Sequence, residues 1–200
     1  MSLSLETKNL YEYLRPSEII DFGTQAVIDC ANSLARGLSD EVFITKRIYE
    51  FVRDRIDHSF DIQGKVIPCK ASDVLRHKQG ICYAKSHLLA ALLRCLGIPA
   101  GFCYQKLIFS DENPCIILHG LNAVYFKGLD QWIRLDARGN KEGVNARFSL
   151  DEELLAFPVR TELGEVDDQK IYAAPNKNVI LALEKSQTIA ELEKNLPTEL

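Results

Sequence analysis

The segment GICYAKSHLLAALLRCLGIP, Gly80–Pro99, predicts one long buried helix with defined ends. From Cys82 to Leu96 it contains no glycine or proline and is rich in leucine and alanine, which are strong helix formers. Gly97 is the expected C-terminal cap, and Pro99 follows at the usual distance from a helix end. A helix with so few polar side chains is expected to lie inside the protein, so we expect this segment to be the central element against which the others pack.

Cys82 is the first residue of this predicted helix. Backbone N–H groups are unpaired there and the helix dipole is positive, so a thiolate would be stabilised. The alternative is that Cys82 is one more small buried apolar side chain, which is the usual role of a free cysteine. A nucleophile would also need a base and a group that orients the base.

The composition is that of an ordinary soluble globular protein, with 200 residues of which 46% are hydrophobic and 26% charged. A net charge of −4 with no run of lysine or arginine disfavours nucleic acid and anionic membranes as partners. The N-terminus lacks the apolar segment of a secretory signal, and no apolar run approaches the roughly 20 residues of a membrane span.

The six cysteines show no C-x-x-C pair and no accompanying His-x-x-x-His, so a zinc site is not expected. Without a signal peptide, thiols are expected rather than disulfides, and the expected compartment is the cytoplasm.

Helical periodicity comes before the central helix, and an alternating pattern follows it, which indicates an α+β fold with an antiparallel sheet. We predict a single domain over residues 1–200, with a core at about 40–140, an N-terminal helical extension at 1–39 and a C-terminal extension at 141–200. The other predicted elements are helices at 17–36, 40–56, 71–77 and 150–157, strands at 101–109, 115–126, 131–135, 171–174 and 179–183, and a peripheral charged helix at 188–196.

Four histidines could serve as the base. His58 lies in an irregular segment, His77 lies near the chain that leads into Cys82, and His87 is expected to face away from Cys82 on the helix. His119 lies early in the second predicted strand, and its position makes it the best candidate for the base.

A hairpin centred on residues 127–128 would place His119 directly opposite Asp136 on one face of the sheet. Opposed side chains have Cβ atoms about 4.5–5.5 Å apart, which suits a carboxylate that accepts a hydrogen bond from an imidazole. A register shift of one residue would move Asp136 to the other face. Separately, His119 could be an ordinary buried histidine and Asp136 an ordinary turn residue.

These residues together resemble the core of the transglutaminase-like superfamily. The resemblance rests on the cysteine helix with its LLRCLGIPA end (residues 92–100), HGLNA at 119–123, QWIRLD at 131–136 and ASDVL at 71–75. It covers roughly residues 45–140, about half of the chain.

The resemblance implies a papain-like architecture in which the cysteine helix packs on an antiparallel sheet that carries the histidine and the aspartate. It implies that Cys82 attacks a peptide or carboxamide carbonyl, that His119 acts as base and then acid, and that Asp136 orients His119. Transfer of the acyl group to an amine would be transglutamination, and transfer to water would be proteolysis or deamidation.

The sequence leaves two points open, which are the role of Lys85 and the identity of a second oxyanion donor. Lys85, one turn after Cys82, either stabilises the thiolate or lies on a solvated face of the helix. The backbone N–H of Cys82 is one expected oxyanion donor, and the side chains of Gln63 and Gln79 are candidates for a second.

The sequence therefore predicts a cytoplasmic thiol hydrolase or acyltransferase without a cofactor or metal, acting on a peptide or protein substrate through a thioester on Cys82. A catalytically silent peptide- or protein-binding module on the same fold is the first alternative. A purely structural α+β domain with ordinary buried cysteines is the second. The oligomeric state is not predicted.

Overall fold

The computed structural model describes residues 3–112 and 114–200, and it has an α+β architecture of helices packed under an antiparallel sheet. The helices are α1 (Gln25–Ala35), α2 (Glu41–Arg55), α3 (Ala71–His77), α4 (Cys82–Cys95), α5 (Lys177–Lys185) and α6 (Ile189–Lys194), with 3-10 turns η1 (Leu10–Leu14) and η2 (Thr161–Leu163). The strands are β1 (Ser4–Leu5), β2 (Asp57–His58), β3 (Gln79–Gly80), β4 (Ala100–Ile108), β5 (Ile116–Phe126), β6 (Gln131–Leu135), β7 (Val166–Asp167) and β8 (Lys170–Ile171).

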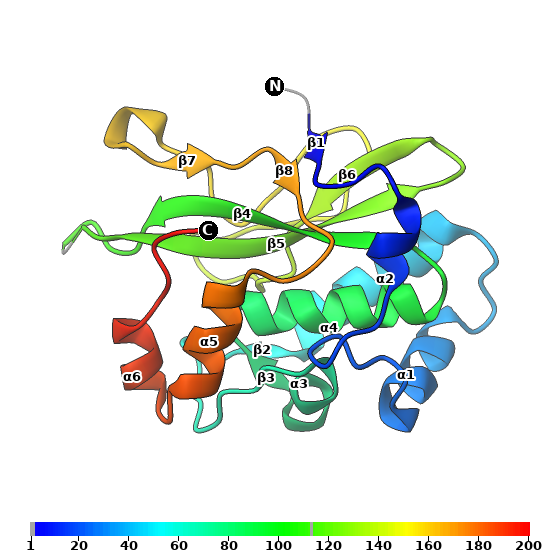
Figure 1. Ribbon diagram of the computed structural model, residues 1–200, viewed down its shortest axis with the longest axis horizontal. Helices are drawn as coiled ribbons and strands as arrows, with labels where there is room; N and C mark the ends of the chain where they lie inside the picture. The colour runs from blue at the N-terminus through cyan, green and yellow to red at the C-terminus, as the bar shows by residue number, and fades with distance from the viewer. Residues whose placement is uncertain (1–2, 113) are drawn as a thin grey trace.

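The central helix is confirmed as α4. It lies lengthwise under β4 and β5, with α1, α2 and α3 packed against its other sides (Figure 1). Every residue from Cys82 to Arg94 is buried, and Gly97 ends the helix at a φ of +76°, which is a conformation that favours glycine. Burial of leucines such as Leu88 and Leu89 contributes about 1.5–3 kcal/mol each.

The main sheet has the strand order β6-β5-β4-β7 with antiparallel neighbours, as the alternating pattern predicts. The predicted helices before α4 are confirmed for α2 and α3. The side chain of Asp40 caps α2 by accepting hydrogen bonds from two backbone N–H groups, those of Val42 and Phe43. A two-residue parallel pair of β2 with β3 ties the segment before α4 to the end of α2.

The predicted helix at 17–36 begins later than expected, at Gln25. The Ser17 hydroxyl accepts a hydrogen bond from the Ile20 N–H at 3.0 Å and closes a turn in its place. The Asp21 carboxylate then accepts a hydrogen bond from the Ser72 N–H at 2.9 Å, which holds the segment against the start of α3. These bonds compete with helical ones, as short polar side chains often do.

Two predictions in the C-terminal part are wrong. No helix forms at 150–157, where the Ala156 N–H donates to Asp136 and the Leu154 carbonyl accepts from the Arg147 N–H. Residues 179–183 lie in helix α5 instead of a strand. Asn176 caps that helix, and Val179, Ala182 and Leu183 form its buried stripe at helical spacing.

Of the predicted strand at 171–174, only Ile171 lies in a strand, β8, and Tyr172 forms a bridge with Phe102. The final helix is confirmed as α6, but it is not peripheral, because Leu192 is fully buried in the core. The main hydrophobic cluster contains residues from Ile19 to Leu196, so both chain ends contribute to it.

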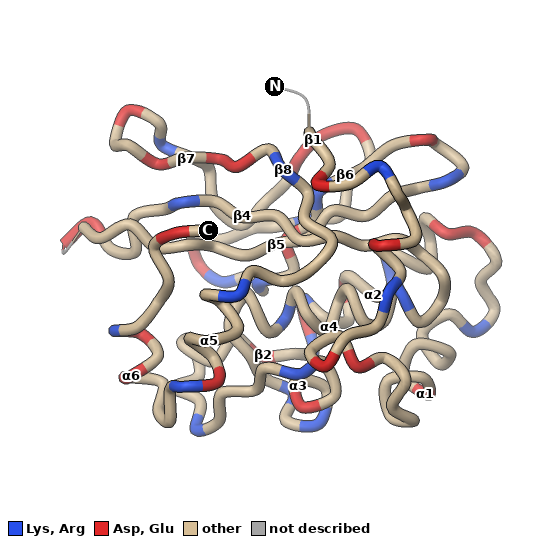
Figure 2. Tube along the Cα trace, in the orientation of Figure 1, with Lys and Arg blue, Asp and Glu red and all other residues tan. Residues whose placement is uncertain are grey.

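Charged residues of both signs are distributed over the helices and loops (Figure 2). Across residues 3–112 and 114–200, no helix combines the length and the apolar character that crossing a membrane requires.

Candidate active site

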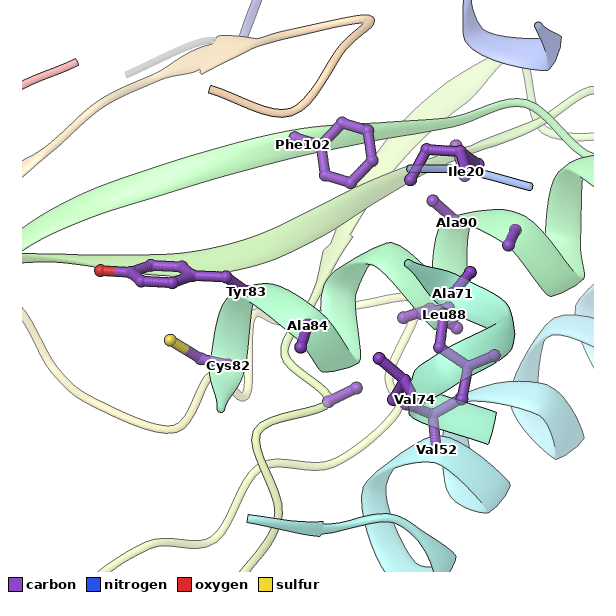
Figure 3. Close-up of a cluster of buried hydrophobic side chains, with 14 of the residues drawn as sticks. Ile20, Val52, Ala71, Val74, Cys82, Tyr83, Ala84, Leu88, Ala90 and Phe102 are labelled. Carbon is purple, nitrogen blue, oxygen red and sulfur yellow. The ribbon is translucent and has the colours of Figure 1, made fainter. Parts of the chain in front are cut away.

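The first turn of α4 presents the Cys82 thiol at the open end of the helix. Figure 3 shows the sulfur pointing away from the packed side chains farther along the helix. Gly80 has no room for a side chain, because a Cβ there would lie 2.9 Å from the Cβ of Ala84. Ile81 is extended and precedes the helix, so the N–H groups of the first turn are free to face an anion.

His119 on β5 and Asp136 just after β6 form a buried hydrogen-bonded pair. The Nε2 atom of His119 donates to Oδ2 of Asp136 at 2.8 Å. The carboxylate also accepts backbone N–H groups from Arg138 and Ala156, each at 3.0 Å. Burial alone would raise the pKa of the Asp136 carboxyl, but the charge of His119 and these hydrogen bonds hold it below its usual range.

The pairing of His119 with Asp136 uses a register two residues away from the predicted one. Phe126 pairs with Gln131, so the turn contains four residues and Asp130 adopts a φ of +51°. His119 is therefore diagonal to Asp136 instead of directly opposite. A shift of two residues keeps both side chains on one face of the sheet, and diagonal neighbours remain within reach of long side chains.

The electrostatics of His119 favour its charged form. Burial lowers the pKa of the imidazole, but the charge of Asp136 and then that of Cys82 outweigh burial and raise the pKa to about 10. Because Nε2 is bound to Asp136, Nδ1 is the nitrogen left for the thiol. This arrangement can hold an imidazolium beside a thiolate.

Cys82 and His119 share the wall of a cavity of about 290 Å³. Most of the other lining residues are apolar, and a few polar ones gather among them, as in many small-molecule and peptide sites. The apolar lining residues are Phe60, Ile81, Tyr83, Leu107, Ile108, Phe109, Ile117, Leu118, Phe157 and Leu196, and the polar ones are His58, Asp61, Arg138 and Lys141.

Tyr83 ties the cysteine end of α4 to the histidine strand. Its hydroxyl donates to the Leu118 carbonyl, and its ring lies against Gly120, where an added Cβ would be 2.7 Å from Cδ1 of the ring. The residue after Cys82 thus contacts both neighbours of His119 in the chain. The sequence alone gave no sign of this contact, because it joins residues that are 35 positions apart.

Three other predicted residues lie elsewhere. His87 is buried in the core and donates from Nδ1 to the Cys69 carbonyl at 2.8 Å, so it faces away from Cys82 as expected. Within the described part of the chain, neither Gln63 nor Gln79 lines the cavity. Neither glutamine is therefore supported as an oxyanion donor.

Lys85 is fully buried, so its placement on a solvated face is wrong. Its Nζ donates to the carbonyls of Arg53, at 3.2 Å, and Ile56, which lie at the end of α2. Burial lowers the pKa of Lys85 to about 7. The side chain thus caps a neighbouring helix at its C-terminal end, where unpaired carbonyls favour a donor.

His58, which the sequence placed only in an irregular segment, lines the cavity beside Cys82. It is 8% exposed, and it reaches the cavity because β2 pairs with β3, which places His58 beside Gly80. Burial and the nearby Arg138 lower the pKa of His58 to about 3, so its ring is neutral near neutral pH. A two-residue strand in a turn-rich segment leaves no periodic signal from which this pairing could be predicted.

A family model described as the transglutaminase-like superfamily matches residues 28–137. The chain belongs to this superfamily. No curated protein sequence matches it. A candidate cysteine protease from Cytophaga hutchinsonii has a similar structure, with a TM-score of 0.53 and 21% identity over 66% of this chain and 43% of that one. At this identity the likeness shows the fold alone.

Two further solved structures are less similar. A candidate protease from Parabacteroides distasonis has a TM-score of 0.42 and 16% identity over 75% of this chain and 30% of that one. Red sea bream transglutaminase has a TM-score of 0.41 and 15% identity over 66% of this chain and 26% of that one. The chain thus covers less than half the length of each of these three proteins.

Proposed function

We propose that this protein is a cysteine-dependent hydrolase or acyltransferase that acts on peptide or carboxamide bonds. The observation that carries the proposal is the hydrogen bond from His119 to the buried Asp136, with His119 and Cys82 in the wall of one cavity. A cysteine at a helix start, a base and an orienting carboxylate are the parts that nucleophilic acyl transfer needs.

In the proposed reaction, the Cys82 thiolate attacks the carbonyl carbon of the substrate and forms a tetrahedral intermediate. The backbone N–H of Cys82 faces the developing oxyanion at the start of α4. The protonated His119 gives its proton to the leaving amine, the C–N bond breaks, and a thioester remains on Cys82. His119 then takes a proton from water or an acceptor amine, whose attack releases the acyl group and restores the thiolate.

Asp136 acts as a positioning residue in this scheme. It holds Nε2 of His119 so that Nδ1 faces the thiol, and its charge stabilises the imidazolium form. Two backbone N–H groups fix the carboxylate in turn, so its orientation does not depend on solvent.

The test is alkylation with iodoacetamide at about pH 6, well below the ordinary cysteine pKa of about 8.5. We expect Cys82 to react faster than Cys115, an exposed thiol that serves as the internal control. Cys82→Ala should remove this fast reaction without unfolding the protein. The proposal is wrong if Cys82 in the wild type reacts no faster than Cys115.

A peptidase and a transglutaminase differ in the acceptor of the acyl group. Turnover of a peptide library with and without a primary amine separates them, because only a transferase forms the new amide. Binding without turnover would instead support the silent binding module.

A reducing compartment fits the cysteines, all six of which are free. Location in the cytoplasm is part of this proposal, and fractionation of cells that produce the protein would test it.

A further inference from the structure

Phenylalanine side chains form the apolar part of the cavity beside Cys82. Phe60 and Phe109 meet edge to face with ring centroids 6.3 Å apart, and Phe157 packs against the ring of His119 at 5.1 Å. Phe109 keeps 39% of its surface exposed. Aromatic surface left open next to a nucleophile is stabilised when an apolar group covers it.

A cluster of three charged residues forms part of the same cavity wall. Asp61 accepts hydrogen bonds from Arg138 at 2.8 Å and from Lys141 at 2.9 Å. One carboxylate is shared between two cations, so the Arg138–Lys141–Asp61 cluster itself carries a net charge of +1. The Lys141 side chain is 49% exposed, so this charge can meet a ligand.

His58 gives an independent sign that a polar ligand group belongs here. Within the described residues, its Nδ1 is buried and has no hydrogen-bond partner, and its distance to Oδ2 of Asp61 is 3.9 Å. Among the buried side-chain nitrogen and oxygen atoms left unpaired in that part of the chain, it alone belongs to a residue that lines the cavity beside Cys82. An unpaired buried polar atom is costly and often marks a place where a ligand or water binds.

We propose that this cavity binds a peptide or amide that carries both a large apolar side chain and a carboxylate. The apolar side chain packs against Phe60, Phe109 and Phe157, and the carboxylate pairs with the net positive charge of the Arg138–Lys141–Asp61 cluster. The inference rests on the proposed function, because it names the substrate class of that site. It disfavours an uncharged glutamine side chain as the group that the cavity selects.

The test measures equilibrium binding to the Cys82→Ala protein by calorimetry, so that no peptide is cleaved. Four blocked tripeptides are compared: acetyl-Ala-Phe-Gly and acetyl-Ala-Gln-Gly, each with a free C-terminal carboxylate or an amide. We expect phenylalanine to bind at least about tenfold more tightly than glutamine. We expect the carboxylate to bind about threefold more tightly than the amide, as is typical of half-exposed charges.

Two pairs of variants in the Cys82→Ala background assign these preferences to their residues. Phe109→Asn should reduce the preference for phenylalanine, whereas Phe43→Asn, an exposed phenylalanine on α2 outside the cavity, should leave it unchanged. Lys141→Glu should abolish or reverse the preference for a carboxylate. Lys127→Glu, in the exposed turn between β5 and β6, makes the same change of net charge and should not.

The inference is overturned if the four peptides bind equally, if glutamine binds more tightly, or if Phe43→Asn and Lys127→Glu have the same effects as the cavity variants. Binding to Cys82→Ala does not depend on a reactive thiol. Failure of the proposed chemistry is instead seen in the alkylation of the wild type, so the two failures are distinguishable.

Discussion

The contact between Tyr83 and Gly120 predicts that Gly120→Ala separates the cysteine from the histidine. The new Cβ would lie 2.7 Å from Cδ1 of Tyr83, and ordinary contact begins at 3.4 Å, so the two elements must part by about 0.7 Å. The ring has little freedom to turn aside, because Tyr83 is 1% exposed and its hydroxyl is bonded to Leu118. The added methyl group is thus expected to displace β5 from the start of α4.

His119 precedes Gly120, so this displacement acts directly on the separation of His119 from Cys82. A misplacement of about 1 Å can lower a reaction rate by about 10²-fold. We therefore expect the rate of alkylation of Cys82 at about pH 6 to fall by about tenfold to 10²-fold. Overpacking should also lower the free energy of unfolding by about 1–3 kcal/mol.

The assay is the rate of iodoacetamide labelling of Cys82 as a function of pH, with urea unfolding measured in parallel. Gly23→Ala is the matched control, because a Cβ there meets nothing within 4 Å. In Gly120→Ala the labelling of Cys82 at low pH should become slower. Its rate should then increase with pH as it does for an ordinary thiol. A change of stability alone would leave the shape of this pH profile unaltered.

A second variant separates the clash from other effects of the methyl group. Tyr83→Leu combined with Gly120→Ala removes the ring edge that the Cβ would meet, so it should recover part of the lost reactivity. If Gly120→Ala reacts with the wild-type pH profile, or if the double variant reacts no faster than Gly120→Ala, the contact does not position the pair.

Three further predictions concern buried groups. Asp136→Asn should lower the pKa of His119 by about one unit or more because a negative charge is lost, and an NMR titration that shows no change would contradict this. Burial lowers the pKa of His87 to about 4, so only the unfolded state gains its proton as the pH falls from about 6.5. The free energy of unfolding should therefore decrease between about pH 6.5 and pH 4, by up to about 3 kcal/mol. His87→Leu should make the free energy of unfolding depend less on pH in this range. An unchanged pH dependence in that variant would refute the role of His87. Lys85→Met should lower the free energy of unfolding in urea by about 1–3 kcal/mol, because the Arg53 and Ile56 carbonyls lose their donor. The alkylation of Cys82 should not become slower. Slower alkylation in a folded variant would mean that Lys85 acts on the thiolate.

The elements that the sequence predicted well are those with strong local signals. Helix α4 combines a long run of helix formers with Gly97 as its cap, and Asp40 marks the start of α2. The alternating pattern located β4, β5 and β6 to within a residue at each end. In each case the residues that decide the structure lie within the element or next to it.

The predictions that failed concern segments whose partners lie far along the chain. The segment at 150–157 has helical residues, but the Ala156 N–H is bound by Asp136, 20 positions earlier. Lys85 looks like a surface lysine until its two carbonyl partners at the end of α2 are known. His58 reaches the cavity only through the pairing of β2 with β3. No local pattern encodes these contacts.

The register of the hairpin shows why the candidate pair could be predicted although its alignment was wrong. Side chains alternate between the two faces of a strand, so the pleat repeats every two residues. The four-residue turn shifted the pairing by two positions, and His119 and Asp136 therefore stayed on the same face. A three-residue turn would have shifted it by one position and a five-residue turn by three, and either would have sent the carboxylate to the opposite face. Sequence reasoning about two residues on neighbouring strands thus tolerates an even error in the turn but not an odd one, and here the 2.8 Å hydrogen bond is reached diagonally.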